Sequence, residues 1–130
     1  MCRVLLVLGC FVWAGTVQAQ DALTGRALFL HYCATCHGEA AEGNGPMAPV
    51  LLVWPKDLTA LAAENGGAFP AERVVARIDG RDALVSHGSS MPVYAEVMAG
   101  ELVEMEIGGA TLTISRRIAD LVAYLMEIQK

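Results

Sequence analysis

The sequence is poor in aromatic side chains and in basic residues. Its 130 residues include two tryptophans, three tyrosines and three phenylalanines, a thin supply for the core of the single domain that this length predicts. Lysine and arginine number 9 against 14 acidic residues, and the net charge of −5 argues against a nucleic-acid-binding surface. Apolar residues at 55% and charged residues at 18% exclude a disordered chain, and 13 glycines with 5 prolines exclude a collagen-like one. Another group is therefore expected to fill part of the interior.

The N-terminal residues 1–19 have the pattern of a secretory signal peptide. Arg3 supplies the positive start, an apolar stretch follows over residues 4–17, and the small residues end at Ala19, after which we expect cleavage. An uncleaved membrane anchor is the alternative, but this stretch is shorter than the ~20 residues of a spanning helix. We therefore expect one domain over residues 20–130, with no membrane span and with a more negative charge once Arg3 is lost.

Cysteine is scarce after this leader. Only Cys33 and Cys36 remain, so a framework of several disulfides is excluded. They belong to the motif Cys33-Ala34-Thr35-Cys36-His37, the C-x-x-C-H signature of c-type haem attachment. Two thiols three positions apart on a turn can bond to the two vinyl groups of one haem, and the histidine that follows can ligate its iron. The motif therefore predicts one covalently attached haem c on Cys33 and Cys36, with His37 as the proximal iron ligand.

Three other uses of this motif stay open. A thioredoxin-like redox pair needs a surrounding βαβ pattern, which the sequence lacks. A zinc site needs four clustered ligands, for which His31, His37 and the two cysteines are the candidates. A disulfide between the two cysteines needs no histidine. Haem attachment is the interpretation that uses both cysteines and the histidine together.

A haem iron with one histidine ligand has a second axial position, and methionine thioether is the usual ligand there in a high-potential electron carrier. Met91 is the predicted distal ligand, because Ser-His-Gly-Ser-Ser before it and a proline after it predict a rigid non-helical loop. His87 is the rival and gives a bis-histidine site of lower potential. Met47 lies too close to His37 in the sequence, and Met126 is expected in the core of a C-terminal helix.

The pattern of capping residues, prolines and apolar positions predicts a mainly helical domain. Helices are expected from Asp21 to about Tyr32, from Pro55 to about Glu64, from Pro70 to about Asp79 and from Ser115 to about Gln129. A glycine-rich loop is expected over Gly38 to Pro46. Alternation over residues 102–107 and 110–114 predicts a small β-hairpin, with an irregular loop as the alternative. Helices wrapped around a buried haem supply the apolar volume that the aromatic residues do not.

The chain after the leader resembles the class I c-type cytochromes over essentially its whole length. Gly25 and Phe29 lie eight and four residues before the first motif cysteine, where that family has a glycine and an aromatic residue. Residues 120–125 read Asp-Leu-Val-Ala-Tyr-Leu, which is similar to the family's last helix. The resemblance implies the cytochrome c fold, with Phe29 packed against Leu121 and Tyr124. It also implies that Gly25 lets the first and last helices approach closely.

Four further residues are candidates for contacts around the haem. The pattern Gly43-x-Gly45-Pro46 is similar to the family loop whose proline carbonyl accepts a hydrogen bond from the proximal histidine, which implies this role for Pro46. Arg77 and Arg81 are candidates for pairing with a haem propionate, because guanidinium suits a carboxylate, and a solvated helix face is the alternative. Trp54 can donate its indole N–H to a propionate, with a plain core position as the alternative.

The resemblance implies an electron carrier and not an enzyme. An iron held by both His37 and Met91 has no open position, so it exchanges one electron and binds no substrate. We expect a periplasmic protein with redox protein partners that carry a basic patch, since the chain is acidic. One alternative is a haem relay subunit of a dehydrogenase or oxidase complex, with the stretch 96–113, longer than in the smallest family members, as its interface. A catalytic or ligand-sensing haem with a displaceable sixth ligand is the other.

Overall fold

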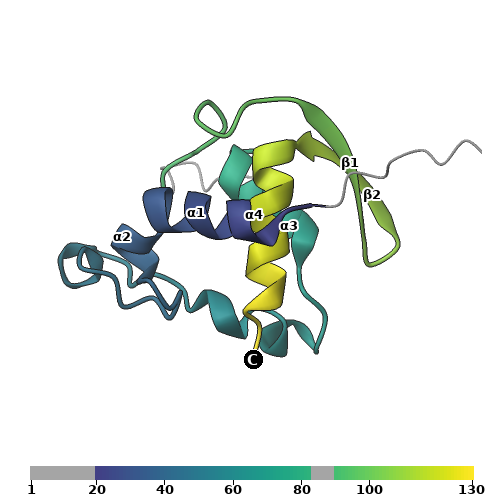
Figure 1. Cartoon of the computed structure of the whole chain (residues 1–130). Helices are drawn as coiled ribbons and strands as arrows, with labels where there is room; N and C mark the ends of the chain where they lie inside the picture. The colour runs from purple at the N-terminus through teal and green to yellow at the C-terminus, as the bar shows by residue number, and fades with distance from the viewer. Residues whose placement is uncertain (1–19, 83–89) are drawn as a thin grey trace, which may run out of the picture.

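The computed structural model of the chain describes residues 20–82 and 90–130, and the expected leader and His87 lie outside this part. Within it, the helices are α1 (Ala22–Tyr32), α2 (Ala34–His37), α3 (Ala71–Asp79) and α4 (Arg116–Glu127). Three 3₁₀ turns, η1 (Ala48–Val50), η2 (Leu58–Ala60) and η3 (Ala63–Asn65), follow α2, and the strands β1 (Leu102–Ile107) and β2 (Ala110–Ser115) precede α4. The prediction of a mainly helical domain with one small hairpin is confirmed (Figure 1). No helix of residues 20–82 and 90–130 has the length and apolar character needed to cross a membrane.

The centre of the fold is the place where α1 crosses α4 (Figure 1). Gly25 stands at this contact, and a Cβ built on it lies 1.9 Å from the carbonyl oxygen of Asp120. Only a residue without a side chain therefore permits the two backbones to approach so closely. Phe29, one helical turn later, is fully buried, and its ring centroid lies 5.4 Å from that of Tyr124. Leu121 belongs to the same buried core, so the packing that the resemblance implied is confirmed.

The ends of three helices follow the expected capping residues. Asp21 is the N-cap of α1, and its Oδ1 accepts hydrogen bonds from the backbone N–H groups of Leu23 and Thr24 at 2.9 and 3.3 Å. The hydroxyl of Thr24 contributes most to holding the pKa of Asp21 below its usual value. Ser115 caps α4 in the same way, and Gly80 ends α3 in the left-handed region with φ +79°.

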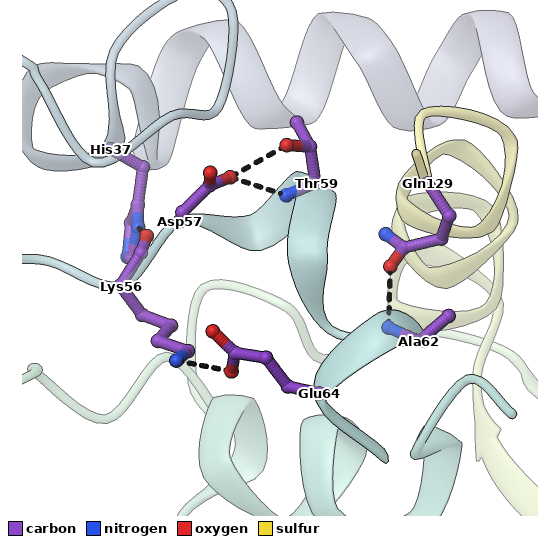
Figure 2. Close-up of polar contacts among 7 residues, drawn as sticks. All are labelled: His37, Lys56, Asp57, Thr59, Ala62, Glu64 and Gln129. Atoms are coloured by element: carbon purple, nitrogen blue, oxygen red, sulfur yellow. Dashed lines mark hydrogen bonds and ion pairs between the residues drawn. The ribbon is translucent and has the colours of Figure 1, made fainter. Parts of the chain in front are cut away.

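The helix expected over residues 55–64 is wrong, because this stretch forms η2, η3 and the turns around them. The Asp57 side chain accepts hydrogen bonds from the backbone N–H and the hydroxyl of Thr59, at 2.8 and 2.7 Å (Figure 2). Such local bonds from a side chain to the backbone compete with helical hydrogen bonds. Gln129, beyond the end of α4, accepts from the Ala62 N–H at 2.8 Å and so ties these turns to the end of the chain (Figure 2).

The predicted hairpin is confirmed, and its two faces differ in character. β1 and β2 pair antiparallel and are joined by Gly108 and Gly109, both with positive φ. Met105 and Ile114 are buried in the core, while Glu104 and Glu106 of β1 are exposed. Figure 1 shows the hairpin on the opposite side of the fold from α2. The hairpin thus presents an acidic surface far from the cysteine motif.

The crossing at Gly25 generates a stability prediction. Gly25→Ala is expected to lower the free energy of unfolding by about 3 kcal/mol, because the added methyl group forces α1 away from the Asp120 carbonyl and loosens the core. Gly100→Ala is the matched control, since a Cβ at Gly100 meets nothing within 4 Å. Urea unfolding of both variants measures the difference, and equal stability of the two variants would contradict the close approach.

Candidate functional site

A cavity of about 650 Å³ lies inside the fold. It is enclosed by the end of α1, α2, the segment 51–64, α3, the segment 90–94 and part of α4. Its walls are mainly apolar and include Phe29, Leu121 and Leu125. Its volume lies within the range of about 300–1,000 Å³ that is usual for small-molecule sites. The interior that the few aromatic residues leave unfilled is therefore a space of ligand size.

Cys33 and Cys36 both border this cavity. Cys33 is the N-cap of the one-turn helix α2, and Cys36 lies within that helix. Both are free thiols. Burial, and to a lesser extent the neighbouring Cys36, raises the pKa of the Cys33 thiol to about 11, so this thiol is protonated at neutral pH. Among residues 20–82 and 90–130, no group of three or more His, Cys, Asp or Glu side chains could hold a metal ion, and His31 is exposed on α1. These residues therefore give no support to the zinc alternative.

His37, the last residue of α2, borders the cavity with a fixed ring orientation. Its Nδ1 lies 2.9 Å from the carbonyl oxygen of Lys56. A carbonyl only accepts, so Nδ1 carries the hydrogen and donates it, and Nε2 keeps the lone pair that can bind a metal. Burial lowers the pKa of His37 more than this hydrogen bond raises it, which favours the neutral ring that ligation requires.

The prediction that the Pro46 carbonyl accepts this hydrogen bond is wrong, because the acceptor is the carbonyl of Lys56. The reason lies in the folding of the glycine-rich loop. The Gly43 N–H donates to the His37 carbonyl at 2.7 Å, and a Cβ on Gly43 would lie 2.4 Å from the carbonyl oxygen of Pro55. This close approach places the backbone after Pro55 beside the imidazole, whereas Pro46 is exposed and does not border the cavity.

Met91 reaches the same cavity from a distant part of the chain. It is half-buried and packs against the hydrophobic core. The other methionines lie elsewhere: Met98 and Met105 are buried in the core, and Met47 is exposed. Met126 is 39% exposed on α4, so its expected core position is wrong. Of the methionines in the part of the chain that the structure describes, Met91 is the one that borders the cavity.

Two of the three residues expected to meet a propionate also border the cavity. Trp54 lines it with a side chain that is 63% exposed, so a plain core position is excluded. Arg77 lines it from α3, and its guanidinium pairs with the Asp82 carboxylate at 2.8 Å. Both side chains thus carry hydrogen-bond donors to the mouth of the cavity.

Arg81 is not brought to the cavity, contrary to the prediction. It pairs with Asp79 at 2.5 Å and borders a separate hollow of about 260 Å³ near the base of the hairpin. The cause is the end of α3 at Asp79. Gly80 turns the chain there with φ +79°, so Arg81 does not continue the helix face that carries Arg77.

Several residues that line the cavity were not expected there from the sequence, and three of them are Arg73, Lys56 and Tyr94. Arg73 lines the cavity one helical turn before Arg77 and makes no ion pair within residues 20–82 and 90–130. The spacing of four residues between Arg73 and Arg77 places both on one helix face, and this signal in the sequence could have identified Arg73. Lys56 lines the cavity and pairs through its ammonium with Glu64 (Figure 2). Tyr94 lines it three residues after Met91, where the sequence offered only an isolated aromatic residue.

The borders of the cavity fit a covalently attached haem c. Two thiols on one turn, a neutral imidazole with its Nε2 available and a thioether from a separate segment are the groups that hold such a haem and its iron. The apolar walls suit a macrocycle, and cationic side chains at the mouth suit its two carboxylates. With this donor set, Cys33 and Cys36 would hold the haem and His37 its iron, and Met91 lines the same cavity.

Comparison with known proteins agrees with this chemistry. The family model described as Cytochrome c matches residues 22–129, which is nearly all of the part that the structure describes. No curated protein and no solved structure gives a significant match. Members of the matched family bind covalently attached haem c with iron. From the family match and from the cavity that its C-x-x-C-H motif borders, the chain belongs to the cytochrome c family.

Proposed function

We propose that this protein is a periplasmic carrier of single electrons whose haem iron is held by His37 and Met91. As a cytochrome c it binds haem and carries electrons. The observation that supports the finer proposal is the meeting of His37 and Met91, from distant parts of the chain, at one apolar cavity. When bound, the haem supplies the one-electron chemistry of its iron. The protein supplies the two ligands, a dry surrounding and a positioned imidazole.

The residues of the cavity have separable roles in this proposal. Cys33 and Cys36 attach the haem, and the Lys56 carbonyl orients the His37 ring and makes it a stronger ligand. Arg77 and Trp54 line the cavity and would meet the propionates at its mouth. With both His37 and Met91 as ligands, the iron would have no open site for a substrate, which separates a carrier from a catalytic or ligand-sensing haem.

The periplasmic location rests on residues 1–19, which we propose to be a signal peptide removed after Ala19. Attachment of haem outside the cytoplasm is consistent with a chain that carries its motif behind such a leader. N-terminal sequencing of the exported holoprotein tests the cleavage site directly.

A second candidate function is a fixed haem relay within a dehydrogenase or oxidase complex. The observation that favours it is the hairpin, whose exposed acidic face lies on the opposite side of the fold from α2 and borders no part of the haem cavity (Figure 1). A partner bound at the hairpin would leave the mouth of the cavity accessible to a second protein. Isolation of the native protein as a stable hetero-complex favours the relay, and isolation as a monomer favours the carrier.

The ligand assignment is tested by Met91→Ala in the holoprotein. We expect the far-red methionine-to-iron band of the oxidised protein to disappear, the spectrum to become high-spin and the reduced protein to bind carbon monoxide, because the sixth position loses its thioether. Met126→Ala is the matched control, since Met126 is an exposed methionine away from the cavity. A spectrum that stays low-spin without change in Met91→Ala would move the assignment to His87.

The orientation of His37 is tested by Gly43→Ala. A Cβ there meets the Pro55 carbonyl and displaces the Lys56 carbonyl from Nδ1, which makes the imidazole a weaker donor to oxidised iron, so we expect the midpoint potential to rise. Gly66→Ala has a similar positive φ of +70° but nothing within 4 Å of its Cβ. Backbone strain costs each variant about 1–2 kcal/mol of stability, and the clash with the Pro55 carbonyl adds to this in Gly43→Ala alone. Redox titration should show a changed potential in Gly43→Ala alone.

The acidic charge predicts the salt dependence of electron transfer. We expect the rate with the cationic complex hexaammineruthenium to fall, and the rate with anionic ferricyanide to rise, as ionic strength increases and the Debye length shrinks from about 30 Å to about 8 Å. Stopped-flow measurements on the holoprotein give both rates. Rates that do not change with salt would contradict electrostatic steering toward a partner with a basic patch.

A further inference from the structure

The segment that carries Met91 is fastened to the fold through the residues that follow it. Val93 lies against the end of α3, where a Cβ on Gly80 would come within 2.6 Å of its side chain. The backbone N–H of Tyr94 donates to the carbonyl of Ile78, inside α3, at 2.8 Å. One side of this segment is therefore held by the C-terminal turn of α3.

The Tyr94 side chain holds the other side. Its hydroxyl donates to the carbonyl oxygen of Tyr32 at 3.1 Å, and the two rings meet edge to face with centroids 6.4 Å apart. Tyr32 is the last residue of α1 and directly precedes Cys33. The last carbonyl groups of a helix have no hydrogen-bond donor within the helix. The Tyr94 phenol supplies that donor to the Tyr32 carbonyl.

Tyr94 thus joins the two parts of the chain that border the haem site. It connects the end of α1, from which the cysteine motif starts, with the end of α3 and the Met91 segment. It is half-buried and lines the cavity itself. Burial raises the pKa of its phenol, so the hydroxyl stays protonated as a donor at neutral pH.

We propose that Tyr94 is a positioning residue that latches the Met91 segment to the end of α1 and thereby limits displacement of Met91 from the iron. The inference rests on the proposed role of Met91 as distal ligand and goes beyond it. Movement of the segment that carries Met91 away from the cavity breaks the Tyr94–Tyr32 hydrogen bond. The bond therefore lowers the population of the open state.

A ligand from solution reports this population. Imidazole binds ferric iron only where Met91 has moved away, so its apparent dissociation constant is the intrinsic constant divided by the open fraction. Loss of one neutral hydrogen bond is expected to raise the open fraction about two- to tenfold. The apparent affinity for imidazole rises by the same factor.

The test is imidazole titration of the oxidised holoprotein at neutral pH, followed by loss of the far-red methionine-to-iron band. Tyr94→Phe removes the hydroxyl alone and is expected to bind imidazole about two- to tenfold more tightly than the unaltered protein. Tyr94→Leu also removes the ring contact with Tyr32 and is expected to bind imidazole more tightly still. Tyr124→Phe is the matched control, because it deletes the same atom from a core ring that does not line the cavity.

The thermal unfolding midpoint separates positioning from simple destabilisation. An imidazole affinity in Tyr94→Phe equal to that of Tyr124→Phe overturns the latch, even if Tyr94→Phe unfolds at a lower temperature. Failure of the ligand assignment looks different: Met91→Ala then keeps its low-spin spectrum, and the latch is overturned together with it. If Met91→Ala loses the band and Tyr94→Phe does not change imidazole affinity, the latch alone fails.

Discussion

The contact of α1 with α4 at Gly25 is the constraint on which the rest of the structure depends. Because no side chain separates the two backbones there, Phe29 and Leu121 pack together beneath the crossing and form one wall of the cavity. α1 then ends at Tyr32, so the cysteine motif begins at the edge of this wall. The close contact between α1 and α4 therefore fixes the position of α1. The end of α1 at Tyr32 in turn fixes where the thiols of the cysteine motif lie.

The proximal side of the site relies on backbone geometry more than on side-chain identity. The His37 ring is oriented by a carbonyl, which any residue at position 56 could supply. What matters is that the chain passes close to α2, and this requires a residue without a side chain at Gly43. Burial keeps the imidazole neutral, and the carbonyl determines which nitrogen carries its hydrogen. The ring is thus ready to bind a metal before the metal arrives.

Charge is distributed unevenly around this centre. The cavity is lined by the cationic side chains of Lys56, Arg73 and Arg77 and by the carboxylate of Glu64, which pairs with Lys56, although the chain as a whole is acidic. Two exposed acidic residues, Glu104 and Glu106, lie on β1, on the other side of the fold from α2. Carboxylates of a bound haem partly neutralise the cations at the mouth. The two regions therefore present different electrostatic surfaces to other proteins.

Local signals in the sequence determined the helices, the hairpin and the haem-binding motif. The cap at Asp21, the stop at Gly80 and the alternation of the hairpin act over a few residues, so they are readable from the chain and are confirmed by the structure. Spacing within the motif likewise defines its chemistry without knowledge of the fold. The failure at residues 55–64 arose where Asp57 bonds the local backbone and redirects it.

Only the tertiary structure decided which distant groups meet. In the structure the Lys56 carbonyl, and not that of Pro46, accepts the hydrogen bond from His37. Arg81 lies away from the cavity, and Tyr94 lies at the end of α1. Every residue has a backbone carbonyl, so residue type does not show which carbonyl will accept a hydrogen bond. The direction of a side chain after the end of a helix depends on a single left-handed turn. Sequence by itself therefore determined which chemistry this protein carries, while the packing of α1, α3 and α4 decided how that chemistry is oriented, because contacts between distant segments depend on the path of the whole backbone.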